Sequence, residues 1–155
     1  MRNAAAHVLA FAAVHERLYT GEDAIVVRLD TFLHDLCYEI GRASGCPDGI
    51  NADVERVDVP TDMAVPLALI VNELVTNVVK HVGPPCNITL RSSTGPALKL
   101  TVSDIGQGPR PDRSRPGLGT RIVNAFCTQL GAHMETRQHA SGYTIELSVP
   151  LPAAR

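Results

Sequence analysis

The sequence predicts an α+β fold: a two-layer α/β sandwich with one mixed sheet and helices on one face. Helical and strand-like segments do not alternate strictly along the chain, which disfavours a parallel βαβ architecture. No linker-like stretch interrupts residues 50–151, so we expect one domain there, preceded by a helical segment over residues 1–46. With 155 residues, 45% of them hydrophobic, the chain is long enough to bury a core without stabilising disulfides or metal ions.

Composition narrows the possible functions. The net charge of -2 gives no electrostatic reason to expect nucleic acid or an acidic membrane as a partner. Only three Tyr, three Phe and no Trp are present, which disfavours a platform for stacked bases. No apolar run approaches the length of a membrane span, so a soluble, cytoplasmic protein is expected. The four cysteines lack zinc-site spacing and are expected to be reduced thiols: Cys37, Cys46, Cys86 and Cys127.

The N-terminal half is predicted to be mostly helical. Residues 2–19 carry a narrow apolar stripe that suggests a partner helix, and Gly21 ends this helix. A second helix is expected over 29–44 and a weak strand over 52–59. A long helix follows over 63–82, capped by Thr61 or Asp62 and stopped by Gly83-Pro84-Pro85.

The C-terminal half is predicted to supply the rest of the sheet. Its expected elements, in order, are strands 87–91 and 98–104 joined by a turn, a loop over 106–117, a helix over 120–130, and a closing hairpin of strands 133–137 and 143–149.

The helix over 63–82 carries the first candidate site. Its apolar residues fall on one broad face, whereas Glu73, Asn77, Lys80 and His81 fall at spacing i, i+4, i+7 and i+8 on another. A carboxylate, an amide, an ammonium and an imidazole suit a magnesium-bound polyphosphate, since they offer oxygen ligands, phosphate donors and a base. The alternative is an ordinary solvated face of an amphipathic helix.

The strand over 98–104 supplies the second candidate. Alternation places Asp104 on the inward face with its apolar neighbours, and a buried carboxylate requires donors. Gly106 and Gly108 follow and permit a tight turn with close approach of a ligand. Such a carboxylate could accept a hydrogen bond from an exocyclic amine such as that of adenine. The alternative is a strand that ends in an Asp-Gly-type turn.

The third candidate is Gly117-Leu118-Gly119-Thr120, which opens a helix. Free N–H groups at a helix N-terminus bind anions, and glycine lets a phosphate approach. Residues 107–116 before it hold three prolines and three arginines, which is typical of a cationic lid over phosphates. The alternatives are a flexible helix start and an ordinary surface loop.

Together, these motifs resemble the ATP-binding catalytic domain of sensor histidine kinases, which has the Bergerat fold. The residues on 63–82 match its N box, Asp104, Gly106 and Gly108 match its first glycine box, and Gly117 and Gly119 match its second. The run from Asn72 to His81 looks most like the bacterial subgroup related to HWE kinases. Val14 to Tyr19 resembles the end of that subgroup's dimerisation hairpin.

The resemblance implies a role for each matched residue. Asn77 would ligate Mg²⁺, Glu73 would act as the catalytic base or order the nucleophile, and Lys80 and His81 would contact phosphate or ribose. Asp104 would accept the adenine amine, Gly106 and Gly108 would shape the base pocket, and the second glycine box with Leu118 and Thr120 would hold phosphate. The function implied is transfer of the γ-phosphoryl of ATP to a histidine, with a response regulator and a homodimer as partners.

Two positions depart from the family pattern, and the acceptor is missing. Ile105 replaces a usual Asn and Tyr143 a frequent Thr, which is expected to reduce affinity for ATP. The helix that carries the phosphoacceptor histidine is not recognisable, and His15 is a poor substitute because it lies on an apolar stripe. The alternatives are therefore a regulatory or scaffold module that binds nucleotide without phosphoryl transfer, and an anti-sigma-type serine kinase.

Overall fold

The computed structural model describes residues 26–83, 85–105 and 117–152. Its elements, in chain order, are β1 (Val26–Arg28), α2 (Leu29–Ala43), β2 (Ile50–Asp53), β3 (Asp58–Pro60), α3 (Thr61–Val82), β4 (Ile88–Thr94), β5 (Ala97–Ile105), α4 (Leu118–Leu130), β6 (His133–His139) and β7 (Gly142–Pro150).

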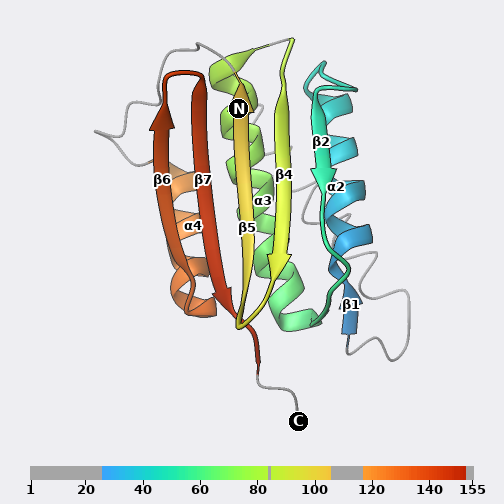
Figure 1. The fold of residues 1–155 in the computed structure, drawn as a ribbon, viewed down its shortest axis with the longest axis vertical. Coiled ribbons are helices and arrows are strands. Elements are labelled where there is room, and N and C mark those ends of the chain that lie inside the picture. Colours follow the sequence, from blue (N-terminus) through green and yellow to red (C-terminus); the bar gives the residue numbers. More distant parts are fainter. Residues whose placement is uncertain (1–25, 84, 106–116, 153–155) are drawn as a thin grey trace.

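The main sheet is mixed and has five strands in the order β2-β4-β5-β7-β6. Strand β2 pairs parallel to β4, and every other neighbouring pair is antiparallel. Helices α2, α3 and α4 all lie on one face of this sheet (Figure 1). The α+β class with a mixed sheet and helices on one face, predicted from the sequence, is thus confirmed, and β1 and β3 form a second, two-stranded sheet.

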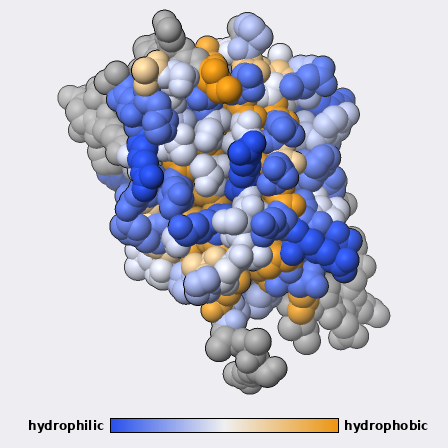
Figure 2. All heavy atoms as spheres, viewed as in Figure 1, coloured by the Kyte–Doolittle hydropathy of each residue, from blue (hydrophilic) through white to orange (hydrophobic). Residues whose placement is uncertain are grey.

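The core lies between the sheet and the helices. Strand β5 shows why, because Leu98, Leu100, Val102 and Asp104 alternate inward while Lys99 and Ile105 face outward. The opposite face of the sheet is open and mostly hydrophilic (Figure 2). An antiparallel sheet with one covered and one solvated face produces this alternation.

Helix α3 is the central helix of the core. Apolar residues recur around most of it, and thirteen of its residues, from Met63 to Val79, are buried. It ends where predicted, since Gly83 takes a positive φ of 69° and its N–H donates to the carbonyl of Val79. By length and composition this helix would qualify as a membrane span, but 72% of the qualifying window is buried inside the domain. It is therefore the core helix of a folded domain.

The predicted strand over 52–59 is replaced by two short strands. The chain leaves the main sheet after Asp53, and β3 pairs with β1 in a separate two-stranded sheet. The side chain of Glu55 explains the break, because it accepts hydrogen bonds from the N–H and hydroxyl of Thr94, each at 2.8 Å. The N–H of Glu55 donates to the hydroxyl of Ser92 at 2.6 Å. These bonds hold the segment after β2 against the end of β4.

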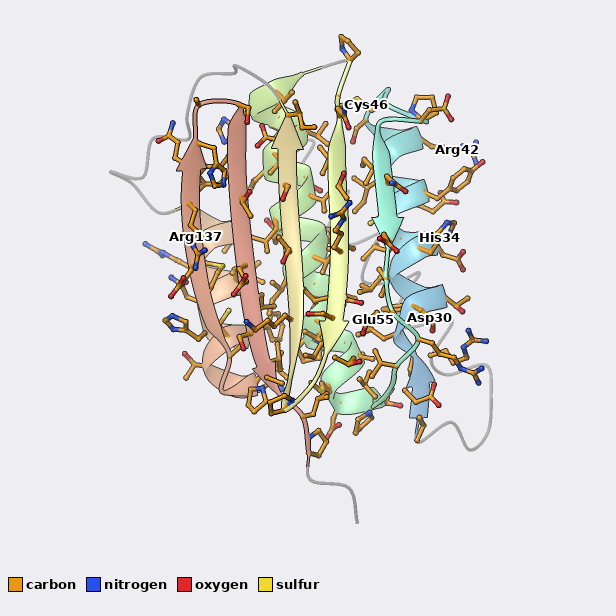
Figure 3. The ribbon with its side chains drawn as sticks, viewed as in Figure 1. Asp30, His34, Arg42, Cys46, Glu55 and Arg137 are labelled. Carbon is orange, nitrogen blue, oxygen red and sulfur yellow. A yellow bond between two sulfur atoms is a disulfide. The ribbon has the colours of Figure 1, made fainter. Side chains whose placement is uncertain are left out.

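The prediction that all four cysteines are reduced is wrong for two of them. Cys46, which follows α2, forms a disulfide with Cys86, which precedes β4 (Figure 3). The two cysteines are 40 residues apart in sequence, so their spacing gave no sign that the α2–β2 and α3–β4 connections meet. Cys37 and Cys127 are free thiols, and burial raises the pKa of each, that of Cys37 to about 12.

The predicted helix over 29–44 is confirmed as α2. Its buried residues, among them Leu29, Leu33 and Cys37, belong to the same core as those of α3 and the sheet. The predicted helix over 2–19 and His15 lie outside the described residues. A division between residues 1–46 and 50–151 therefore stays a prediction.

Candidate functional site

The described candidate residues come from segments at one end of the sheet. Asp104 is the second-last residue of strand β5, which ends there, and β7 begins there after the β6–β7 turn (Figure 1). Strand β4 begins at the same end, because its first residue, Ile88, pairs with Asp104. Helix α3 ends at Val82, just before β4 begins, and therefore also finishes at this end. The lid predicted over 107–116, together with Gly106 and Gly108, lies outside the described residues.

The polar residues of α3 do not form a uniformly solvated stripe. Glu73 is buried with only 4% of its surface exposed, whereas Asn77 and His81 are half-buried and Lys80 is exposed. Glu73 is thus the most buried of the four residues. At Glu73 the structure contradicts the alternative of a solvated face, since water is replaced by protein around this carboxylate.

The carboxylate of Glu73 lies against the first turn of α4. A Cβ atom at Gly119 would collide with Oε2 of Glu73 and come within 3.2 Å of its carboxyl carbon. Glycine at position 119 therefore lets α4 begin directly over this carboxylate. At Gly117, in contrast, a Cβ would meet nothing within 4 Å. The first and third candidate motifs thus meet at the α3–α4 contact, through residues 73 and 119.

Asp104 occupies the inward position predicted for it and is 9% exposed. Its Oδ1 accepts a hydrogen bond of 2.7 Å from the backbone N–H of Tyr143, the residue that pairs with it on β7. The carboxylate is therefore fixed through one oxygen by a neighbouring strand. Its second oxygen can accept a further bond, because a carboxylate offers about four acceptor positions.

The second glycine box opens α4 as predicted. Gly117 is the N-cap residue, and Leu118 and Thr120 are exposed in the first turn. Gly117 has no side chain with which to cap the first N–H groups of this helix. Such a helix start suits an anion such as phosphate.

Two residues at the site were not identified as functional from the sequence. Gly142 and Tyr143 lie directly beside Asp104, and the sequence predicts an effect only for the side chain of Tyr143. Their contribution is a backbone conformation and a backbone N–H. A sequence pattern carries no direct signal for either.

The donor set suits Mg²⁺, which prefers oxygen ligands and retains waters and phosphate oxygens. Asn77 offers an amide oxygen and Glu73 a carboxylate one turn earlier on α3. Within the described ranges, no group of three or more His, Cys, Asp or Glu residues could hold a metal ion by itself. A metal here would therefore depend on ligands from the nucleotide.

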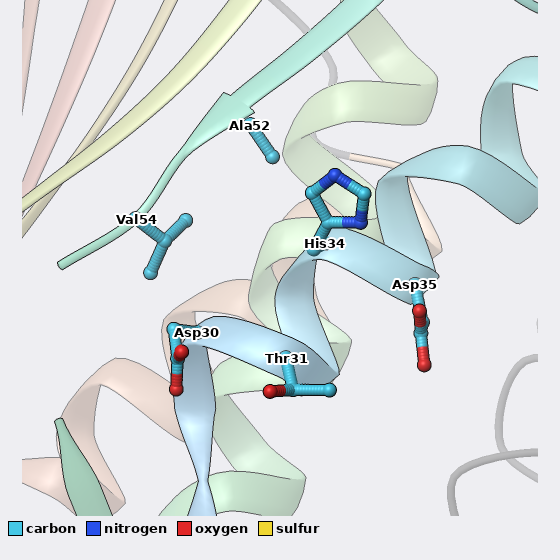
Figure 4. Close-up of a pocket in the computed structure, with 6 residues that line it drawn as sticks. All are labelled: Asp30, Thr31, His34, Asp35, Ala52 and Val54. Atoms are coloured by element: carbon cyan, nitrogen blue, oxygen red, sulfur yellow. The ribbon is translucent and has the colours of Figure 1, made fainter. Parts of the chain in front are cut away.

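A surface pocket of about 280 Å³ lies elsewhere, between α2 and the strand segment around β2 (Figure 4). None of the candidate residues lines it. Its lining consists of Asp30, Thr31, His34, Asp35, Ala52 and Val54. Asp30 is already paired with Arg28 at 2.7 Å, which holds the pKa of this carboxyl below its ordinary value.

Residues 63–153 match the family described as histidine kinase-, DNA gyrase B-, and HSP90-like ATPase. The chain belongs to this ATPase family. The relatives and solved structures that it resembles include catalytic domains of histidine kinases. The ATP-binding domain predicted from the motifs is thus confirmed, whereas the roles of individual site residues stay predictions.

Relatives of this ATPase domain include a light-responsive kinase. Blue-light-activated histidine kinase 2 of Erythrobacter litoralis is 33% identical over 110 residues, which cover 66% of this chain and 32% of that protein. The chain thus spans about a third of the length of that relative. This similarity agrees with the HWE-related subgroup predicted from Asn72 to His81.

Solved structures show the same fold. The histidine kinase domain of the Erythrobacter litoralis EL346 blue-light activated kinase superposes with a TM-score of 0.75 at 27% identity, covering 94% of this chain and 71% of that one. The mycobacterial sensor histidine kinase MprB superposes with a TM-score of 0.63 at 20% identity, covering 81% of this chain and 96% of that one. At that identity, the second likeness shows the fold alone.

Proposed function

We propose that the protein containing this domain transfers the γ-phosphoryl of MgATP to a histidine, with the nucleotide held between α3, the first turn of α4 and the end of β5. The observation that carries the proposal is the meeting of Glu73 with Gly119. It puts a buried carboxylate at a helix start that suits phosphate. Catalysis of phosphoryl transfer is mainly positioning and charge neutralisation, which these residue types can supply.

In this proposal, different residues contact the base, the ribose, the phosphates and the metal ion. Asp104 accepts a hydrogen bond from the adenine amine, and Gly106 and Gly108 shape the base pocket. Asn77 ligates Mg²⁺, which neutralises charge on the phosphates when bound. Lys80 and His81 contact phosphate or ribose, and Gly117, Leu118, Gly119 and Thr120 contact phosphate from the start of α4. Glu73 orders the attacking group or takes its proton.

The partners follow from this activity. A phosphohistidine passes its phosphoryl group to a response regulator, and the full-length protein dimerises through helices N-terminal to the catalytic domain. We place the protein in the cytoplasm, where ATP is supplied. Because α2 shares the core with α3, the catalytic domain is best drawn to include α2.

Two other functions are tested against this one. A scaffold module would bind nucleotide and regulate a partner without turnover, and would use the same nucleotide site. The presence of both Glu73 and Asn77 argues against it, since a carboxylate base and a metal ligand are residue types that turnover requires. An anti-sigma-type serine kinase would use the same pocket on a protein hydroxyl.

Glu73→Gln separates these cases. We expect ATP turnover, measured as ADP release, to fall about 100-fold or more, because a positioned base contributes about that much. Affinity for MgATP should remain within about threefold, since the shape of the side chain is kept. Glu39→Gln, on the exposed side of α2, is the matched control and should change neither quantity.

The chemistry of the product distinguishes the two kinases. A phosphohistidine is labile in acid, whereas a phosphoserine ester survives it. Acid-stable label on a protein acceptor would contradict the histidine kinase. Absence of any turnover in the unmodified chain, with nucleotide bound, would favour the scaffold.

A further inference from the structure

The turn between β6 and β7 lies directly against the end of β5. Gly142 opens β7 with a φ of 152°, a conformation that side chains disfavour. A Cβ atom at this position would collide with the carbonyl oxygen of Asp104 and come within 3.5 Å of its Oδ1. Position 142 therefore requires glycine on two independent counts, conformation and space.

This close approach delivers a donor to the carboxylate. Because Gly142 pairs with Ile105 and Tyr143 with Asp104, the N–H of Tyr143 reaches Oδ1 of Asp104 at 2.7 Å. A hydrogen bond of this length to an ionised acceptor is a strong one. It fixes how the carboxylate is turned at the end of the strand.

The turn is itself held in place. The hydroxyl of Thr144 lies 3.3 Å from that of Ser103 on β5 and 3.2 Å from Nε2 of His139 on β6. These contacts join the three strands β5, β6 and β7 one residue beyond the Tyr143 N–H. The donor is thus carried by a strand that is bonded to its neighbours on both sides.

We infer that Gly142 and the backbone N–H of Tyr143 are positioning residues for base selection: they orient the Asp104 carboxylate so that its second oxygen accepts the adenine amine. Neither is among the candidate residues of the N box or the glycine boxes. The inference rests on the proposed function, because it assumes that adenine binds at Asp104.

The inference also changes the effect expected of the Tyr143 side chain on adenine binding. The Tyr side chain at a position where a Thr is frequent was expected to weaken adenine binding. A backbone N–H is the same for either residue. Selection of adenine should therefore be insensitive to the side chain at 143 and sensitive to the backbone set by Gly142.

The test compares ATP with purine riboside triphosphate, which lacks only the exocyclic amine. Dissociation constants are measured by calorimetry with Mg²⁺ on the full chain. The unmodified chain should prefer ATP by about tenfold or more, as expected for a hydrogen bond to a charged group. Gly142→Ala should reduce this preference to about threefold or less, with little change in affinity for the analogue. The ratio of the two constants reports base selection and is insensitive to a general loss of active protein.

Gly95→Ala is the matched control. Gly95 lies in the hairpin between β4 and β5, where a Cβ would meet nothing within 4 Å, so this variant should keep the full preference for ATP. A folded Gly142→Ala variant with the full preference would overturn the inference.

Tyr143→Thr keeps the inference testable if Gly142→Ala fails to fold. It should retain the preference for ATP, and loss of the preference would show that the side chain carries the selection. In ¹⁵N-labelled protein, the amide proton of Tyr143 should shift upfield in Asp104→Asn, and an unchanged shift would also overturn the inference. If the unmodified chain binds neither nucleotide, the proposed function fails; if it binds both equally, the inference and the Asp104 role on which it rests fail, whereas nucleotide binding by this domain stands.

Discussion

At the scale of single residues, the site depends on two carboxylates that the fold keeps largely away from water. Glu73 and Asp104 are 4% and 9% exposed, and each lies against a glycine that has no room for a side chain. A Cβ at position 119 would collide with the carboxylate of Glu73, whereas a Cβ at position 142 would collide with the backbone carbonyl of Asp104. Both sites therefore depend on a close approach that only glycine allows.

A double-mutant cycle at Glu73 and Gly119 tests the first of these contacts. Gly119→Ala alone should lower the free energy of unfolding by about 1 kcal/mol or more, because the added methyl group meets a buried carboxylate. In a Glu73→Ala background the same change should stabilise the chain by up to about 1 kcal/mol, because alanine favours a helix over glycine. Urea unfolding of the four proteins gives both values. The same sign in both backgrounds would mean that Glu73 does not restrict position 119.

The sequence identified both carboxylates but not what surrounds them. Asp104 could be placed inward because strand alternation has a period of two, and Glu73 could be placed on a shared face because helix spacing is regular. The contact with Gly119 and the bond from Tyr143 depend on tertiary packing. No local pattern encodes either of them.

At the scale of elements, the side chain of Glu55 joins the segment after β2 to the hairpin between β4 and β5. Glu55 binds both the N–H and the hydroxyl of Thr94. Hydrogen bonds from the hydroxyl and then the N–H of Thr94 lower the pKa of Glu55 from its ordinary value of 4.5. A carboxyl with a lowered pKa in the folded state stabilises the fold when ionised.

The sign of the pH dependence follows from that shift. The contribution of Glu55 should be fully present above about pH 4.5 and be lost as the pH falls through its lower folded-state pKa. Glu55→Gln should therefore flatten the decline of stability in this acidic window, measured by urea unfolding between about pH 3 and 7. Asp53→Asn is the control, because its pairing with Arg91 is 3.9 Å long and over 70% exposed on both sides. If both variants flattened the decline of stability equally, the loss of a surface charge alone would explain the change.

Most element boundaries followed from the sequence, and the exceptions have a common cause. Helices α2, α3 and α4 and the strands from β4 to β7 were predicted within a few residues. Strand β1 and the separation of β2 from β3 were missed. Three- and four-residue strands have too few positions to show an alternation, and their pairing depends on segments distant in sequence.

At the scale of the whole molecule, a disulfide joins the two connections that precede β2 and β4. It closes a loop between positions 40 residues apart and lies beyond the end of α3. By the chain-entropy relation, a loop of this length stabilises the fold by about 4 kcal/mol. It also fixes α2 to the layer that carries the candidate site.

Reduction should therefore lower the stability of the domain. We expect the unfolding midpoint in urea to fall on addition of a dithiol reductant, because the unfolded chain gains freedom. The Cys46→Ser, Cys86→Ser double variant should resemble the reduced chain and no longer respond to reductant. Cys127→Ser, at a half-buried free thiol, is the control and should respond as the unmodified chain does. A midpoint that ignores reductant in the unmodified chain would contradict the stabilising role.

The central claim is that α3, the start of α4 and the end of β5 together bind MgATP. Titration calorimetry with ATP, with and without Mg²⁺, on the unmodified chain and on Asn77→Ala tests it most directly. We predict Mg²⁺-dependent binding to the unmodified chain and loss of that dependence in Asn77→Ala, because the amide oxygen on α3 is the proposed metal ligand. No binding to the unmodified chain, or an equal response to Mg²⁺ in both proteins, would contradict the account.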